Sequence, residues 1–297
     1  MLDFCPITTE DLPKIVPYLS GNGAHFCDFS PVNLYIWSGL MFDAYAIVED
    51  TVVFRLKTWR GRIAYTVPMG MGDIRRALLF LQEETKRLGQ PLIFSLVSAD
   101  DLPLLRDMFG SISEPRTSEN WRDYIYDARK MAAYEGSAYA KQRNHVRRFC
   151  KTYPDYRVEV LQKHHLPDVD ELLARFPAQR GKTDDDVLEE VERTNEALHC
   201  MDELMLFGVV LYVDDQLVGV SAGSCVGDML FVNFEKADTA FDGVYQMLVQ
   251  AFAQQYVNDN IRYINREEDC GDEGMRKSKL AYHPIDLLAK YTVEVSV

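Results

Sequence analysis

Residues 204–236 read LMLFGVVLYVDDQLVGVSAGSCVGDMLFVNFEK. Apolar residues dominate 204–213, 216–224 and 229–236, and Asp214-Asp215 separates the first two runs as a tight turn would. Runs of this length, rich in valine and leucine and bounded by turn residues, are typical of β-strands. The sequence therefore predicts three consecutive strands here.

The clearest helical pattern in the chain follows these strands. The residues that recur on one helical face are Phe241, Val244, Tyr245, Leu248, Ala251, Phe252 and Gln255. A strand at 261–265, a short helix at 273–281 and a strand at 291–297 complete this half. We therefore expect strands, a long helix, a strand, a helix and a final strand.

The first half of the chain repeats that order. The predicted strands are 44–49, 51–59, 62–67, 92–97 and 124–128, and the predicted helices are 74–88 and 99–109. Antiparallel strands combined with crossover helices indicate an α/β fold with mixed, mostly antiparallel sheets flanked by helices. We therefore predict two tandem domains, residues 1–130 and 131–297, related by structural duplication.

Composition limits the class of protein. The 297 residues are 47% hydrophobic and carry a formal net charge of −14, so the chain as a whole repels nucleic acid and anionic membranes. The longest apolar run, 204–213, is about half of the ~20 residues that span a bilayer, and the N-terminus lacks the pattern of a signal peptide. We expect a cytoplasmic protein without a membrane span, its six scattered cysteines reduced.

Several sequence blocks are distinctive. They are FSPVNLYIW at 29–37, DYIYD at 123–127, KQRNHV at 141–146, EKAD at 235–238, FDGVYQ at 241–246, YINREEDCGDEGMRKSKL at 263–280, YHP at 282–284 and KY at 290–291. Together these blocks resemble a bacterial family of unknown function that is grouped with the C-terminal domain of phosphatidylglycerol lysyltransferases. The resemblance extends over essentially the whole chain and implies two tandem GNAT-like acyltransferase domains.

The resemblance also implies an activity. The lysyltransferase relatives take an aminoacyl group from a charged tRNA and pass it to an amine or hydroxyl. They carry a large membrane part that this chain lacks, so we expect a small molecule or peptide as acceptor. Two other functions stay open: an acyl-CoA-dependent N-acyltransferase, and a non-catalytic protein that senses a small ligand. The oligomeric state is left open.

Acyl-CoA enzymes of this fold hold pyrophosphate in a glycine-rich turn before the main helix. Here that junction keeps only Gly243, and Asp238 and Asp242 would repel phosphate. The donor is therefore either an acyl-CoA held by an unusual loop or an aminoacyl-tRNA.

Acyl transfer needs a base for the attacking group and a donor for the oxyanion. Glu235, at the end of a predicted strand, is the candidate base, and Tyr282 or Tyr245 is the candidate acid. Backbone N–H groups near 233–235 would supply the oxyanion donor. The alternative for each of these side chains is a structural tyrosine or a surface carboxylate.

Candidate substrate-binding residues follow the strand at 261–265. They are Asn265, Arg266, Glu267 and Asp269, joined by Asn33 and Trp37 from the first half. An acid and an arginine together suit the amine and carboxylate of an amino acid or peptide. The alternatives are an ion-pair network that locks the loop and, for the aromatic segment, ordinary core packing.

Candidate anion-binding residues lie on a predicted helix at 137–153 and near the C-terminus. They are Lys141, Asn144, His145, Arg148, Gly243, Arg276, Lys277 and Lys279. Such a local basic patch suits tRNA phosphates, and the alternative is a solvated basic face. The adjacent pair His164-His165 lacks metal-ligand spacing, so no metal is expected.

Overall fold

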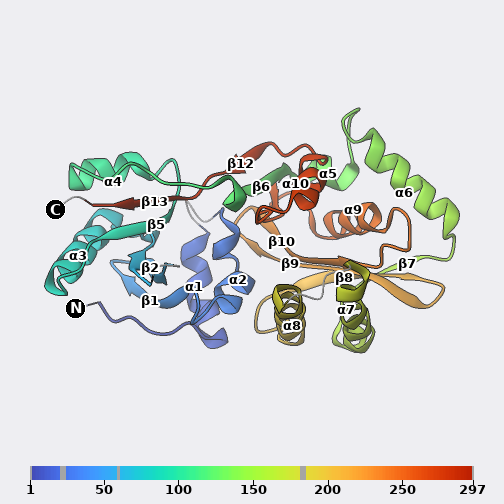
Figure 1. The fold of residues 1–297 in the computed structure, drawn as a ribbon, viewed down its shortest axis with the longest axis horizontal. Helices are drawn as coiled ribbons and strands as arrows, with labels where there is room; N and C mark the ends of the chain where they lie inside the picture. Colours follow the sequence, from blue (N-terminus) through green and yellow to red (C-terminus); the bar gives the residue numbers. More distant parts are fainter. Residues whose placement is uncertain (1, 21–24, 59–60, 181–184, 296–297) are drawn as a thin grey trace. The chain divides into compact units, whose positions relative to one another are not determined.

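The computed structural model describes residues 2–20, 25–58, 61–180 and 185–295 (Figure 1). It divides into two compact units. The first comprises Met1–Tyr124, Glu267–Lys277 and Asp286–Val297, and the second comprises Ile125–Arg266 and Ser278–Ile285. Two late segments that sequence order places in the second half therefore fold with the first unit.

The first unit is built on a six-stranded sheet of order β1-β2-β3-β5-β13, with β4 paired to β2. The strands are β1 (Phe42–Val48), β2 (Thr51–Lys57), β3 (Ile63–Tyr65), β4 (Met69–Gly70), β5 (Ile93–Val97) and β13 (Tyr291–Glu294). Neighbouring strands are antiparallel except β3 and β5. The strand predicted at 291–297 forms over Tyr291–Glu294, and its last two residues lie outside the described residues. It pairs with β5, because its apolar Val293 completes the first core rather than the second.

Helices α1 (Leu12–Leu19), α2 (Pro31–Ile36), α3 (Ile74–Arg87) and α4 (Leu102–Phe109) belong to this unit, with strand β12 (Asp286–Leu288). Three short 3₁₀ turns are η1 (Thr9–Asp11), η2 (Cys27–Phe29) and η3 (Glu119–Trp121). Leu81 of α3 and Leu105 of α4 pack into one core with Phe94 of β5. Helix α2 was not predicted, because six residues are too few to show a helical period. Its N-cap is Ser30, directly before Pro31, and the Ser30 side chain accepts a hydrogen bond from the N–H of Asn33.

The second unit contains the strand order β6-β11-β10-β9-β8-β7. The strands are β6 (Asp123–Asp127), β11 (Tyr263–Asn265), β10 (Met229–Ala237), β9 (Gln216–Val226), β8 (Phe207–Val213) and β7 (Arg157–Val160). Only the β10–β11 pair is parallel. Asp214 and Asp215 both adopt positive φ, 49° and 64°, so the predicted hairpin turn is confirmed.

Helix α9 (Val244–Tyr256) covers one face of this sheet, and α7 (Leu166–Arg180) and α8 (Asp185–His199) lie on its other side (Figure 1). A Cβ placed on Gly219 or Gly223 of β9 would meet Leu248 or Phe252 of α9, so odd-numbered residues of β9 face that helix. Helices α5 (Ala128–Ala133), α6 (Ala140–Thr152), α10 (Glu273–Leu280) and the turn η4 (Lys163–His165) complete the fold.

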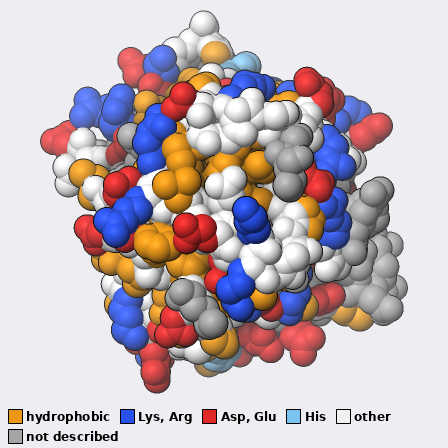
Figure 2. All heavy atoms as spheres, turned by 90° about the vertical axis from the view of Figure 1, so that its left-hand side faces the viewer, with side chains coloured by type: hydrophobic (Ala, Val, Ile, Leu, Met, Phe, Trp, Pro, Cys, Tyr) orange, Lys and Arg blue, Asp and Glu red, His pale blue; other side chains and the backbone are white. Residues whose placement is uncertain are grey.

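Both units have the mixed, mostly antiparallel sheet and flanking helices expected of GNAT-like domains, so the predicted fold class is confirmed. Over the described residues, no helix combines the length and apolarity that crossing a bilayer requires. Figure 2 shows acidic and basic side chains interspersed over one face of the molecule, with hydrophobic side chains between them. None of the six cysteines, which all lie in the described part of the chain, forms a disulfide bond.

Candidate active site

The second unit has an irregularity where two parallel strands stop pairing. Met229–Phe231 of β10 pair with Tyr263–Asn265 of β11, but β10 continues to Ala237. Between Val232 and Phe234 the register with β9 shifts, which leaves Asn233 as a bulge. The strand and loop beyond this point carry Glu235 and Arg266.

Arg266 and Glu235 form a buried ion pair. Arg266 Nη2 lies 2.5 Å from Glu235 Oε2, and the side chains are only 8% and 13% exposed. Burial works to lower the pKa of Arg266, but the charge and hydrogen bond of Glu235 together with the nearby hydroxyls of Tyr126 and Tyr282 outweigh it and raise the pKa. Arg266 therefore keeps its positive charge over the physiological range.

The same two side chains also carry polar atoms without a partner among the described residues. These atoms are Oε1 of Glu235 and Nε and Nη1 of Arg266. A buried donor or acceptor left unsatisfied costs about 1–3 kcal/mol, so such atoms usually mark a bound water, ion or ligand. One acceptor and two donors are thus available at the centre of the site.

Tyrosines surround the ion pair. The guanidinium of Arg266 lies 4.7 Å from the ring centroid of Tyr282, whose pKa burial raises to about 12. The ring of Tyr134 lies 6.1 Å from that of Tyr282, and its hydroxyl donates to the carbonyl of Gln246 on α9. Tyr282 therefore keeps its proton at neutral pH and could donate it to a leaving group.

The backbone at Arg266 is held from α10. Lys279, although a lysine, is buried and donates from Nζ to the carbonyl of Arg266 at 2.6 Å. Tyr126 donates in turn to the carbonyl of Lys279, and Asn265 is fully buried. Lys279, predicted to bind an anion, is thus buried within the unit, with its ammonium on the backbone of Arg266.

The acids that follow β11 belong to the first unit and are each paired. Glu267 Oε1 accepts from Asn33 Nδ2 at 2.9 Å. Asp269 accepts from Arg276 and from the hydroxyl of Tyr124, and the hydrogen bonds from Arg276 lower the pKa of Asp269 to about 2. These contacts correspond to the locking network that the sequence allows as an alternative.

A second buried cluster lies in the first unit, around Lys290. Its ammonium lies 2.5 Å from Asp28 and 2.8 Å from Asp123, and it also pairs with Glu268. Cys27 completes the group: its N–H donates to Asp123, and its thiol lies 3.4 Å from the ammonium.

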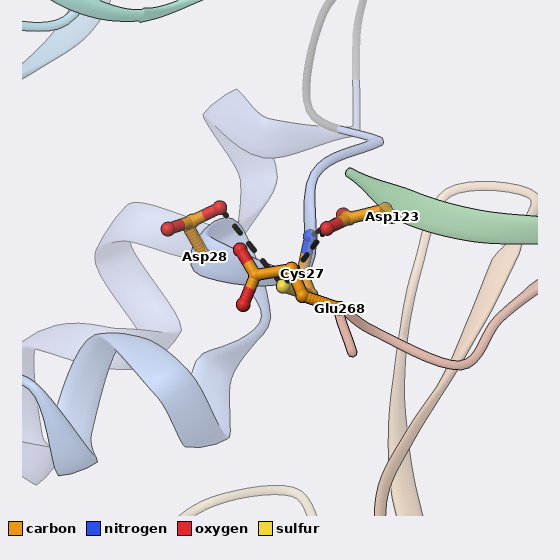
Figure 3. A group of neighbouring side chains, drawn as sticks. All are labelled: Cys27, Asp28, Asp123 and Glu268. Atoms are coloured by element: carbon orange, nitrogen blue, oxygen red, sulfur yellow. Dashed lines mark hydrogen bonds between the residues drawn. The ribbon is translucent and has the colours of Figure 1, made fainter. Parts of the chain in front are cut away.

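Figure 3 shows four of these side chains converging. The ligand atoms of Cys27, Asp28, Asp123 and Glu268 lie within 4.8 Å of one another, a spacing that would suit a metal ion. The Lys290 ammonium already occupies this group, and the negative charges of Asp123 and Asp28 raise its pKa well above the ordinary value despite burial. The cluster is thus organised around an internal cation.

Helix α6 presents a third feature. Lys141, Asn144, His145 and Arg148 recur at helical spacing and line one hollow of about 270 Å³. Arg148 also pairs with Asp242 at 2.7 Å, beside the first turn of α9. The structure therefore groups four of the predicted anion-binding residues on one face.

Three predicted residues, Tyr245, Trp37 and Lys277, lie apart from these groups, whereas Gly243 packs against the backbone of His145 on α6. Tyr245 is half-buried on the first turn of α9, and Gly243 caps that helix with φ 86°. Trp37 is 41% exposed, and Lys277 is an exposed side chain on α10. Sequence reasoning in turn missed Ser221, Tyr134 and Lys290, because strand and core positions carry no local signal of a shared site.

Solved structures provide one point of comparison. A conserved protein of unknown function from Bacteroides thetaiotaomicron VPI-5482 is 29% identical, with a TM-score of 0.92 over 100% of both chains. The C-terminal domain of an Agrobacterium fabrum protein described as a putative lysylphosphatidylglycerol synthetase is 12% identical, with a TM-score of 0.67 over 98% of this chain and 93% of that one. L-PGS from Bacillus licheniformis is 14% identical, with a TM-score of 0.64 over 97% and 92%. At the identities of the last two, the likeness shows a shared fold.

Sequence comparisons agree with this picture. An uncharacterised protein of Mycoplasmoides gallisepticum is 22% identical over 191 residues, and the match spans 60% of this chain and only 57% of that relative. The family model described as Phosphatidylglycerol lysyltransferase, C-terminal, matches residues 24–294. Since the match covers most of the chain, the protein belongs to the family of phosphatidylglycerol lysyltransferase C-terminal domains.

Proposed function

We propose that this protein transfers an aminoacyl group from a charged tRNA to an amine or hydroxyl of a small molecule or peptide. The observation that carries the proposal is the buried Arg266–Glu235 pair, with its unsatisfied acceptor and donors, at the end of the β10–β11 pairing. The family is named for lysyl transfer, which involves the same reaction class.

The base, the oxyanion donor and the acid of the reaction are assigned to different groups in this site. Oε1 of Glu235, free of the ion pair, accepts the proton of the attacking amine or hydroxyl, directly or through a water. The oxyanion donor is proposed to come from the backbone near the Asn233 bulge, where the register of β10 with β9 shifts two residues before Glu235. Tyr282, protonated and packed on Arg266, is the proposed acid for the leaving group.

The start of α9 favours aminoacyl-tRNA over acyl-CoA as donor. A pyrophosphate would need free N–H groups there, but the Asp238 carboxylate already accepts from the N–H of Ala240. Asp242 places a second carboxylate at the same turn, where it is paired with Arg148 of α6. Basic side chains instead gather on α6, where Lys141 and Arg148 suit the phosphates of a tRNA.

A transfer assay tests this function. Radiolabelled aminoacyl-tRNAs of all specificities would be incubated with the protein and a panel of amines, hydroxyl compounds and peptides. We expect label to leave at least one tRNA only when both protein and acceptor are present, and Glu235→Gln to abolish this. Turnover of acyl-CoA with no loss of label from tRNA would instead establish the acyl-CoA enzyme, and binding without turnover would establish the sensor.

A further inference from the structure

Ser221 lies beside the ion pair, although no sequence motif includes it. Ser221 of β9 is the direct ladder partner of Glu235 of β10. Directly opposite residues of an antiparallel pair hold their Cβ atoms about 4.5–5.5 Å apart and share a face of the sheet. That face is the one under α9, since the neighbouring Gly219 and Gly223 approach Leu248 and Phe252.

Buried polar atoms without a hydrogen-bond partner are concentrated around the Arg266–Glu235 ion pair. Eight buried side-chain nitrogen and oxygen atoms lack a partner among the described residues, and four of them belong to Ser221, Glu235 and Arg266. Ser221 is 0% exposed and Arg266 is 9% exposed. Unrelated packing defects would be scattered, so a cluster of this kind points to a missing ligand.

The chemistry of the four atoms defines the ligand. Glu235 Oε1 is an anionic acceptor and Ser221 Oγ can accept beside it, which together suit a protonated amine. Nε and Nη1 of Arg266 are donors that lie in the plane of the guanidinium, whose face is covered by the Tyr282 ring. An oxygen acceptor must therefore approach Arg266 edge-on.

We propose that Ser221, Glu235 and Arg266 form a binding site for the head of an α-aminoacyl group. The protonated α-amine binds Ser221 Oγ and one lone pair of Glu235 Oε1, whose other lone pair remains for the proton of the attacking group. The carbonyl oxygen binds the free N–H groups of Arg266 before the attack. This inference rests on the proposed function and adds a requirement to it: the aminoacyl substrate must carry a free α-amine. The site binds the α-amine and carbonyl that aminoacyl groups share and does not select among their side chains.

Calorimetric titration with L-amino acid amides and their Nα-acetyl counterparts tests the site. We expect at least one amide to bind and its acetylated form to bind at least about 10-fold more weakly, which corresponds to about 1.4 kcal/mol. Ser221→Ala and Glu235→Gln should each weaken the amide and leave the acetylated form unchanged.

Ser224→Ala is the matched control, because Ser224 is an equally buried serine of β9 that bonds to Asn233 instead. Equal binding of acetylated and free amides, no binding of any amide, or equal effects of Ser221→Ala and Ser224→Ala would overturn the site and leave an ordered water as its occupant. If the amides bind as expected but no tRNA loses its label, the site stands and the proposed transfer fails.

Discussion

Arg266 Nη2 lies 2.5 Å from Glu235 Oε2 inside the second unit, and neither side chain is more than 13% exposed. Pairing two buried charges stabilises a fold little, because desolvation offsets most of the attraction. Removing one partner is far more damaging, since the other charge stays buried alone. For this reason, variants of Arg266 and Glu235 must be compared both in their free energy of unfolding and in their transfer activity.

Arg266→Ala should therefore lower the free energy of unfolding by about 3–5 kcal/mol, and Glu235→Gln by less because the amide is neutral. The double variant Arg266→Met with Glu235→Gln should be more stable than Arg266→Ala yet inactive. Urea unfolding and the tRNA transfer assay measure the two quantities. An active double variant would remove this pair from the chemistry.

The two candidate acids can be distinguished by removing one hydroxyl at a time. Tyr282→Phe keeps the ring over Arg266, so its unfolding should match the wild type to about 1 kcal/mol while the transfer rate falls by about 100-fold. Tyr245→Phe should leave the rate unchanged. The opposite pattern of rates would assign the acid to Tyr245.

Lys290→Met should destabilise the first unit by about 3–5 kcal/mol, because Asp28, Asp123 and Glu268 would lose their shared cation. Lys277→Met is the control, since that side chain is 81% exposed and should change stability by less than about 0.5 kcal/mol. Thermal and urea unfolding of both variants provide the comparison. Similar melting of the two variants would show that the cluster does not depend on its ammonium.

The raised pKa of Glu268 predicts that the free energy of unfolding depends on pH. Burial raises its pKa to about 8 from 4.5, against the opposing effect of Lys290, so the folded protein holds this proton more tightly than the unfolded chain. The resulting stabilisation is complete below the unfolded pKa and is lost as the pH rises through about 8. Wild-type stability should therefore fall more steeply than that of Glu268→Gln between about pH 5 and about pH 8 in urea titrations. Parallel curves would contradict this.

The hollow on α6 predicts salt-dependent binding of tRNA. Lys141→Glu and Arg148→Glu should each weaken binding and reduce the slope of log affinity against log salt by about 0.7–0.9 for every phosphate that the variant no longer neutralises. Lys163→Glu, on an exposed lysine of the same unit, is the control. If all three variants bind tRNA like the wild type in filter-binding titrations, the basic face is only solvated.

The strands and helices were open to prediction because their patterns are local. The run at 204–236 forms β8, β9 and β10, and the apolar stripe after it forms α9. The sequence order also indicated two sheets of similar construction, and the block at 263–280 indicated the family. A period of two or of 3.6 residues needs no knowledge of distant contacts.

Tertiary structure alone decided which distant residues meet. It paired β13 with β5, placed Lys290 among acids from three separate segments, and set Ser221 opposite Glu235. Each of these contacts depends on strand register or on burial shared by segments remote in the chain. Neither the register nor the shared burial can be inferred from the residues next to it in the sequence. The sequence by itself determined the elements and the family, whereas packing determined the constellation of side chains that makes a site.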